Sequence, residues 1–196
     1  MTAVEILNNE YAAIFKFLDE NKQPSLSSDL NKYFKKVLIL SAASYFEHEI
    51  QLLLVRFVSD STNGNPKLVS FLKRKAIGMQ YHTYFTWGEK NKPDEPGKNA
   101  NAFFSMFGDD FRTECEGEVK KDAGLNSAIK SFIEIGHLRN ILVHSNFAAM
   151  NLDTKTTEEI YKLYESATPF LTYLERKLLP PRENPANFSS LEVSKK

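Results

Sequence analysis

The clearest chemical signal in the sequence is a polar cluster inside an otherwise apolar stretch, SFIEIGHLRNILVHSNF at residues 131–147. Arg139, Asn140 and His144 lie within it. Arginine offers a permanently charged, planar fork that suits a phosphate group, and histidine can give or take a proton near neutral pH. These residue types could therefore bind a phosphate ester and move a proton. A buried structural ion pair for the arginine and a satisfied core position for the histidine are the competing interpretations.

The two ends of this motif point in different directions if the segment is helical. On a helical wheel, His137, Asn140 and His144 cluster on one side, whereas Arg139 lies about 140° away from His144. Arg139 and His144 can share a site only if the helix loosens near its end, or if a second copy of the chain contributes the partner residue. The pattern leaves both alternatives open.

A second polar set interrupts the apolar run VLILSAASYFEHEIQLLLVRFV at residues 37–58. In a helix its members fall within a sector of about 120°, and they are Ser41, Ser44, Glu47, His48 and Gln51. The sector is either a solvent-facing stripe or a buried polar seam. Glu49 lies outside it.

The spacing of the apolar residues predicts an all-α fold of about five to six helices. The expected long helices cover about residues 4–21, 30–59, 126–146 and 157–179, and a further helix starts at Pro66. Ser28 or Asp29 is the expected N-cap of the second helix, and Thr156 with Glu159 has capping-box spacing. Residues 88–99 are predicted to form a loop that precedes a Phe-rich segment. We expect one domain over residues 1–180, with a variable insertion at about 63–120 and a flexible tail at 181–196.

Composition restricts the classes of function. The 196 residues contain 25 Lys plus Arg and 25 Asp plus Glu, so the net charge is zero. The chain therefore lacks the bulk positive charge of a protein that coats nucleic acid. A local patch would have to serve, and Lys73, Arg74 and Lys75 form the strongest basic run, although a solvated helix face explains them equally well. The aromatic residues at 81–107 are expected to pack rather than to stack on bases.

No cofactor or metal site is expected from the sequence. The chain has one cysteine, Cys115, and four histidines without an HExxH pattern. A single cysteine suits a reducing compartment. Glu5 and Glu10 interrupt the first apolar pattern, which favours neither a signal peptide nor a membrane span. We therefore expect a cytoplasmic protein without a membrane segment.

The segment RNILVH, Arg139 to His144, resembles the R-x(4–6)-H signature of the HEPN superfamily, including a polar residue directly after the arginine. It lies near the end of a late apolar helix, and an earlier apolar helix carries an acidic residue in SYFEHEIQ. The segment at 80–111, QYHTYFTWGEKNKPDEPGKNANAFFSMFGDDF, is similar to the RiboL-PSP-HEPN branch. The resemblance covers roughly residues 1–180 and implies a HEPN-like helical bundle.

The resemblance implies a metal-independent endoribonuclease that works as a homodimer, with the active site in the cleft between subunits. It implies attack of the ribose 2′-OH on the neighbouring phosphate, which leaves a 2′,3′-cyclic phosphate and a 5′-OH. Members of this branch often occur in prokaryotic defence loci, so the expected role is a toxin or an anti-phage effector. An antitoxin or operon partner protein could accompany it.

The matching positions suggest a role for each site residue. His144 would transfer a proton, and Arg139 would hold the phosphate. Asn140 would orient the imidazole or bind a phosphate oxygen. Glu47, preferred over Glu49 because it shares the polar sector, would fix Arg139 or set the tautomer of His144.

Other residues and other functions stay open at this stage. His48 and Ser44, together with Lys73, Arg74 and Lys75, are weaker candidates for RNA contacts. One alternative function is a non-catalytic HEPN-like module that binds a partner protein or a nucleotide. Another is a plain helical scaffold, in which the two polar sectors would face away from each other.

Overall fold

A computed structural model of the chain describes residues 1–180 except 90, 146, 149, 151, 153 and 154. The elements, in chain order, are α1 (Ala3–Glu20), α2 (Pro24–Ser61), α3 (Pro66–Leu72), the π-helix η1 (Lys73–Ile77), α4 (Gly78–Tyr84), β1 (Gly88–Glu89), β2 (Lys92–Pro96), α5 (Asn101–Ser105), α6 (Asp109–Lys121), α7 (Ala123–His144) and α8 (Thr157–Leu178). The all-α prediction is confirmed. The tail predicted at 181–196 lies outside the described residues.

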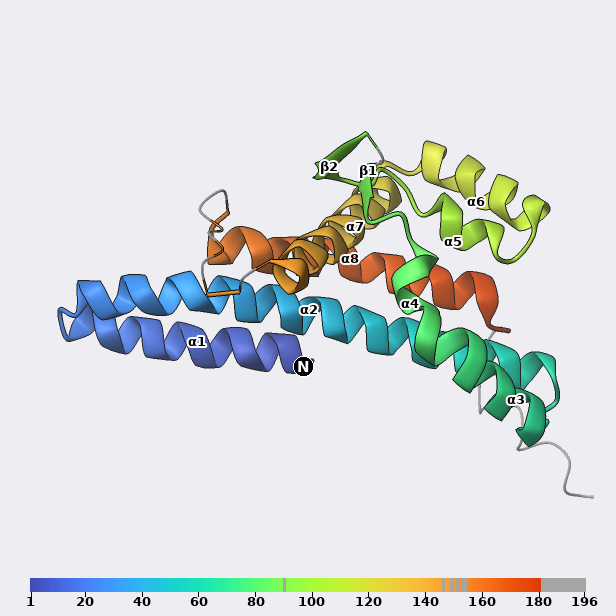
Figure 1. Cartoon of the computed structure of the whole chain (residues 1–196), viewed down its shortest axis with the longest axis horizontal. Coiled ribbons are helices and arrows are strands. Elements are labelled where there is room, and N and C mark those ends of the chain that lie inside the picture. The colour runs from blue at the N-terminus through green and yellow to red at the C-terminus, as the bar shows by residue number, and fades with distance from the viewer. Residues whose placement is uncertain (90, 146, 149, 151, 153–154, 181–196) are drawn as a thin grey trace, which may run out of the picture.

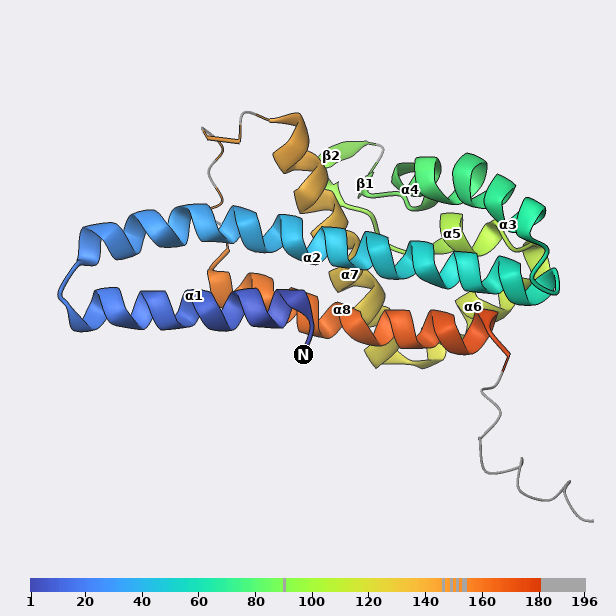
Figure 2. The same cartoon turned by 90° about the horizontal axis from the view of Figure 1, so that it is seen from below.

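The 38-residue helix α2 is the central helix of the bundle. α1 runs antiparallel to its first half, α8 lies along it next to the start of α1, and α7 crosses it (Figures 1 and 2). Contact with several helices explains why α2 is apolar on most sides, and Ala42, Phe46 and Ile50 are almost completely buried. Length and composition alone would let α2 cross a membrane. Packing inside the bundle accounts for part of this apolar stretch, whereas Val37 and Leu52 are exposed.

Two helix starts differ from the sequence prediction. α2 begins at Pro24 and has Gln23 at its N-cap, so Ser28 and Asp29, predicted as caps, lie inside the helix. Proline suits the first turn of a helix because its missing N–H has no partner there. α7 begins at Ala123, three residues before the predicted start, and Asp122 caps it. The capping box of Thr156 and Glu159 at the start of α8 is confirmed.

The region at 63–120 is more structured than predicted. Within the described residues the chain forms eight α-helices and one π-helix, rather than five to six, because this region breaks into several short helices. The loop predicted at 88–99 is wrong in part, since β1 and β2 form an antiparallel hairpin there. The charged sequence of this hairpin lacks the alternation of apolar residues that marks a half-buried strand.

The aromatic residues of this region join the core of the bundle. Phe85 stacks on Phe103, with ring centroids 4.9 Å apart, and meets Phe132 of α7 edge-on at 4.8 Å. Five of the aromatic side chains are buried, namely Tyr84, Phe85, Trp87, Phe103 and Phe104. The region therefore shares one core with the long helices, and it forms one wall of the site described below.

α1 and the first turns of α2 form a hairpin arm, defined as residues 12–33. It extends beyond the ends of α7 and α8 (Figures 1 and 2). Ser27 is its one buried residue. Five large apolar side chains of the arm are exposed: Ile14 at 51%, Phe15 at 37%, Phe17 at 62%, Leu26 at 54% and Tyr33 at 48%. The arm thus packs mainly on itself.

A buried lysine fastens the segment after α7 to α2. Lys36 is completely buried, and its Nζ donates to the carbonyl oxygens of Phe147 at 2.6 Å and Ala148 at 3.5 Å. The ammonium group also lies 5.2 Å from the ring of Phe147 and 5.5 Å from that of Tyr33. A cation suits carbonyl groups just beyond a helix C-terminus. Lys36 therefore fixes the chain three residues after His144.

We expect Lys36→Met to lower the free energy of unfolding by about 1 kcal/mol. The apolar stem is kept, but the hydrogen bonds to the two carbonyls are lost. The loss of stability stays small because Phe147 and Ala148 are exposed, so water can take over part of the hydrogen bonding to their carbonyl groups. The midpoint of thermal unfolding should fall by about 2–4 °C. Lys35→Met, at the half-buried neighbouring lysine, is the control, and an equal fall there would contradict the assignment.

Candidate active site

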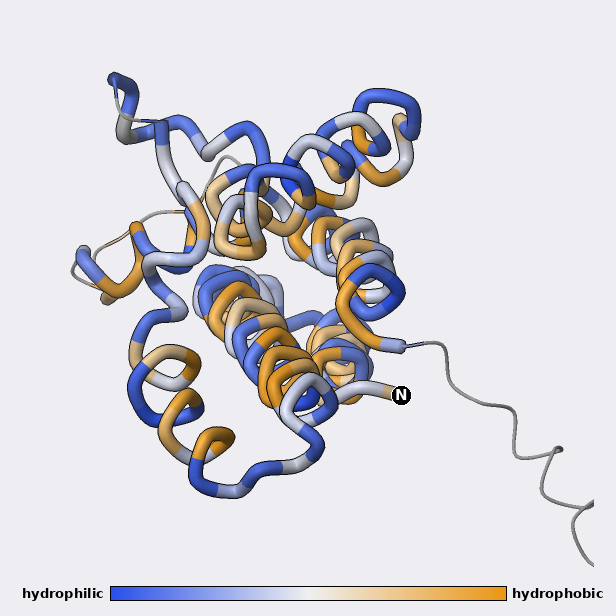
Figure 3. The backbone as a smooth tube through the Cα atoms, turned by 90° about the vertical axis from the view of Figure 1, so that its right-hand side faces the viewer, coloured by the Kyte–Doolittle hydropathy of each residue, from blue (hydrophilic) through white to orange (hydrophobic). Residues whose placement is uncertain are grey.

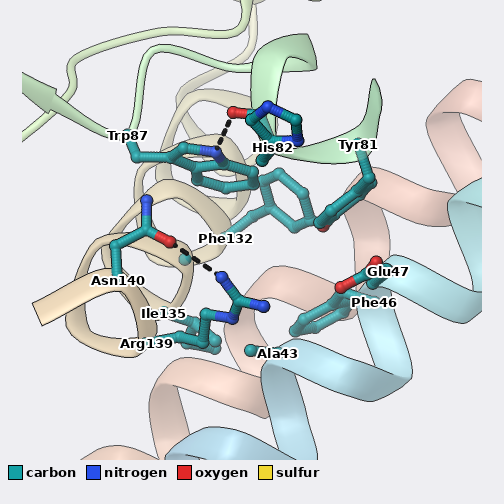
Figure 4. A pocket seen from close by; sticks show the side chains of 11 residues that line it. Ala43, Phe46, Glu47, Tyr81, His82, Trp87, Phe132, Ile135, Arg139 and Asn140 are labelled. Carbon is teal, nitrogen blue, oxygen red and sulfur yellow. Dashed lines mark hydrogen bonds between the residues drawn. The ribbon is translucent and has the colours of Figure 1, made fainter. Parts of the chain in front are cut away.

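A small cavity of about 20 Å³ lies between α2, α4 and α7. It has room for about one water molecule. Its lining residues come from three parts of the chain: Ala43, Phe46 and Glu47 of α2; Tyr81, His82 and Trp87 of the 81–87 segment; and Phe132, Ile135, Gly136, Arg139 and Asn140 of α7. Arg139 and Glu47 point toward each other from two sides of the cavity (Figure 4). We call this cavity the Arg139 pocket.

The pocket contains two opposite charges that do not pair directly. Arg139 Nη1 donates to Asn140 Oδ1 at 3.2 Å, and Gln51 Nε2 donates to Glu47 Oε1 at 3.2 Å. Among the described residues, neither Arg139 nor Glu47 has an ion-pair partner within 4.0 Å. Arg139 therefore keeps N–H donors for an anionic ligand.

The same two charges shift the pKa of the Tyr81 phenol. Burial raises its pKa most, the carboxylate of Glu47 raises it further, and the guanidinium of Arg139 opposes both. Tyr81 thus stays a neutral hydroxyl that can donate a hydrogen bond near the pocket. Sequence reasoning treated this tyrosine only as a packing residue.

The structure separates Glu47 from Glu49. Tyr45 has its pKa raised to about 12, first by burial, then by Tyr164, and then by the carboxylates of Glu49, Glu5 and Glu175. Glu49 therefore belongs to the acidic surroundings of Tyr45, on the side of α2 that meets α1 and α8. Glu47 faces α7 instead and lines the pocket with Arg139. The catalytic role of Glu47 stays a prediction.

His144 is not part of the pocket. It is exposed, and it is the last residue of α7, which remains a regular α-helix up to that point. The first of the two alternatives, a helix that loosens before His144, is therefore not what the structure has. His137, on the same side of the wheel, is buried, and its Nε2 lies 3.2 Å from the carbonyl oxygen of Asp94, which links α7 to β2. His137 is a structural residue.

The polar sector of α2 is neither fully solvated nor buried. Ser44 and His48 are exposed, whereas Ser41, Glu47 and Gln51 are half-buried. The sector faces the Arg139 pocket through Glu47, so the two polar sectors do not turn away from each other as the scaffold hypothesis requires. The remaining candidates, Lys73, Arg74 and Lys75, lie outside the pocket on η1.

A glycine in the middle of α7 shapes the pocket wall. A Cβ atom added to Gly136 would lie 2.1 Å from two atoms of the Trp87 indole, so the ring rests directly on the helix backbone. The indole Nε1 donates to the carbonyl oxygen of His82 at 3.1 Å. Sequence reasoning treated Trp87 only as a packing residue, and it did not identify His82 or Gly136 as pocket residues. A lone glycine inside the apolar stretch SFIEIGHL was the available signal, because such a glycine often marks close packing.

Within the described ranges, no three His, Cys, Asp or Glu side chains are grouped so that they could hold a metal ion.

A family model described as RiboL-PSP-HEPN matches residues 5–179, from within the first turn of α1 to just past the end of α8. No curated protein and no solved structure matches the chain.

Proposed function

Because the chain belongs to the RiboL-PSP-HEPN family, we propose that it is a metal-independent endoribonuclease of the toxin or anti-phage type. Membership itself supports a nuclease-like or HEPN-module role in general. The observation that carries the finer proposal is the meeting of Arg139 and Glu47 in one pocket, although 92 positions separate them in the sequence. His144, the remaining motif residue, stands exposed at the end of the same helix as Arg139.

The proposed reaction uses the ribose of the substrate as its own nucleophile. A base removes the proton of the 2′-OH, the 2′ oxygen bonds to the adjacent phosphorus, and the bond from phosphorus to the 5′ oxygen breaks. That oxygen takes a proton, so the products are a 2′,3′-cyclic phosphate and a 5′-OH. His144 is the proposed proton-transfer group, and the guanidinium of Arg139 stabilises the charge on the phosphate. The hydrogen bond from Arg139 to Asn140 makes Asn140 a positioning residue for the guanidinium.

The proposed active form is a homodimer, because one chain does not bring Arg139 and His144 together. The exposed end of α7 carries His144 beside Val143, which is 48% exposed, and Phe147 lies just beyond it at 40%. Tyr33 and Val37 of α2 are also exposed, at 48% and 40%, and Tyr33 shares the Lys36 ammonium with Phe147. Contact between two such ends would cover apolar surface. The proposal requires that this contact place each His144 at the Arg139 pocket of the other chain.

The direct test is incubation of the purified protein with single-stranded RNA in the presence of EDTA. We expect cleavage that leaves 2′,3′-cyclic phosphate and 5′-OH ends, and no cleavage of an oligonucleotide whose riboses are all 2′-deoxy. Cleavage that requires added divalent metal would contradict the mechanism. Complete lack of cleavage would favour the alternative, a non-catalytic HEPN module that binds a partner protein or a nucleotide.

A further inference from the structure

The segment at 61–88 carries only positive charges, although the chain as a whole has a net charge of zero. It contains Lys67, Lys73, Arg74 and Lys75 and no aspartate or glutamate. All four cations are exposed, and within the described part of the chain none of them forms an ion pair within 4.0 Å. A cluster of uncompensated cations creates a local positive potential that attracts a polyanion.

These cations surround two adjoining hollows. A groove of about 1040 Å³ runs between α2 and the α3–η1–α4 segment, and Lys73 and Arg74 line it together with His48 and Gln51. A shallower hollow of about 530 Å³ on α3 is lined by Pro66, Lys67, Ser70, Phe71, Arg74 and Lys75. Arg74 belongs to both. We call the two hollows together the basic groove.

The basic groove also offers apolar contact surface. Phe71 is 59% exposed and lies among three of the four cations. Leu52 and Met79, on opposite walls of the larger hollow, are 45% and 69% exposed. Seen from this end of the molecule, hydrophobic and hydrophilic residues alternate along the helices (Figure 3). An exposed aromatic ring between cations is the combination that holds single-stranded nucleic acid, since phosphates meet the cations and a base can stack on the ring.

The basic groove leads toward the Arg139 pocket. Gln51 lines the groove, and its Nε2 donates to Glu47, which lines the pocket. His48, next to Glu47 in the sequence, is on the groove side. A strand that lies in the groove can therefore continue to the proposed cleavage site.

We propose that the basic groove binds the single-stranded part of the RNA substrate, with the Phe71 ring under an unstacked base and Lys73 and Arg74 on the phosphates. The proposal rests on the ribonuclease function for the choice of ligand. An acidic protein segment would satisfy the same cations. The RNA is favoured because the groove continues to the Arg139 pocket, and because Phe71 stands apart from the aliphatic side chains that would receive an apolar helix face.

The test measures binding separately from cleavage. The probe is a fluorescent single-stranded RNA of about 20 nucleotides whose riboses carry 2′-O-methyl groups, so that the 2′ oxygen cannot attack. We expect Phe71→Ala to weaken binding of this probe by about fivefold or more, because stacking of one base is lost. Lys73→Glu combined with Arg74→Glu should reduce the slope of log Kd against log salt concentration by about 1.4, because each lost phosphate contact removes about 0.7 from the slope.

Matched controls come from elsewhere on the surface. Phe17→Ala removes a ring that is 62% exposed on the arm, and Lys120→Glu with Lys121→Glu reverses two exposed charges at the end of α6. We expect both controls to bind the probe as the parent does. Equal binding by Phe71→Ala and the parent would overturn the stacking assignment, and an unchanged salt slope in the charge-reversal variant would overturn the phosphate assignment.

Two further arms separate the proposals. If poly-glutamate of equal charge displaces the probe as well as unmodified single-stranded RNA does, the groove is a protein-binding surface and the RNA assignment is wrong. If the probe binds as expected but unmodified RNA is not cut, the groove assignment stands and the proposed ribonuclease function fails.

Discussion

Neither the Arg139→Ala protein nor the His144→Ala protein should cleave RNA alone, but a mixture that has exchanged subunits should recover about a quarter of the parent activity. Each substitution alone is expected to lower the rate of RNA cleavage by about 10²–10⁴-fold, the range for removal of a proton-transfer group or a charge-stabilising donor. The recovery follows from the geometry of α7, which stays helical to His144 and keeps its imidazole away from the Arg139 pocket. Each cleft would then take Arg139 from one chain and His144 from the other.

The size of the recovery comes from counting. Random exchange makes half of the dimers mixed, and each mixed dimer has one cleft with both residues and one cleft with neither. The experiment compares initial rates of RNA cleavage at equal total protein, before and after subunit exchange. No recovery, with both variants folded and dimeric, would mean that the two residues act within one chain. Loss of cleavage in His82→Ala but not in His144→Ala would move the proton transfer to His82, which already lines the pocket.

Gly136→Ala should destabilise the bundle strongly. The new Cβ would overlap two atoms of the Trp87 indole at 2.1 Å, and the ring cannot move away without leaving its hydrogen bond to His82. We expect a loss of about 3 kcal/mol in the free energy of unfolding, at the upper end for overpacking. Because Trp87 is the one tryptophan in the sequence, its fluorescence spectrum should shift in the folded variant. Any residual RNA cleavage should fall as well, since the indole is a pocket wall.

The control for this prediction is a second glycine inside a helix. Gly117 of α6 has no atom within 4 Å of an added Cβ. Gly117→Ala should therefore raise the stability, by up to about 1 kcal/mol, through the better helix propensity of alanine. Equal stability of the two variants would show that the indole does not rest on Gly136 in solution.

Much of the fold could be predicted because the long helices are encoded locally. The three- and four-residue spacing of apolar side chains marked α1, α2, α7 and α8, and the side chains of Thr156 and Glu159 fixed the start of α8. Where the start depended on a proline rather than on a side-chain cap, as at Pro24, the sequence pointed to later residues. The β-hairpin was missed because its charged residues show no face pattern.

The site could be predicted only as a set of residue types. The sequence placed Arg139 and His144 about 140° apart, and the structure has them on different surfaces. The resemblance suggested Glu47 as a partner of Arg139, but whether the two residues share a pocket depends on how α2 and α7 cross, so their meeting needed the tertiary structure. Trp87 and Tyr81 reach the pocket through packing between distant segments, which leaves no local pattern. The same holds for Phe71, an exposed aromatic in a region where most of the aromatic residues build the core.

The hairpin arm at residues 12–33 makes the stability of the molecule uneven. Separating its two helices exposes little apolar surface that is not already in water, because Ser27 is its one buried residue. Opening of the arm therefore costs much less free energy than unfolding of the bundle, where α7 and α8 bury a shared aromatic core. The boundary between the two regimes lies at Tyr11 and Phe34, whose rings stack with centroids 3.6 Å apart. Up to that ring pair the arm can exchange its amide hydrogens by local opening, while the helices that carry the Arg139 pocket stay closed.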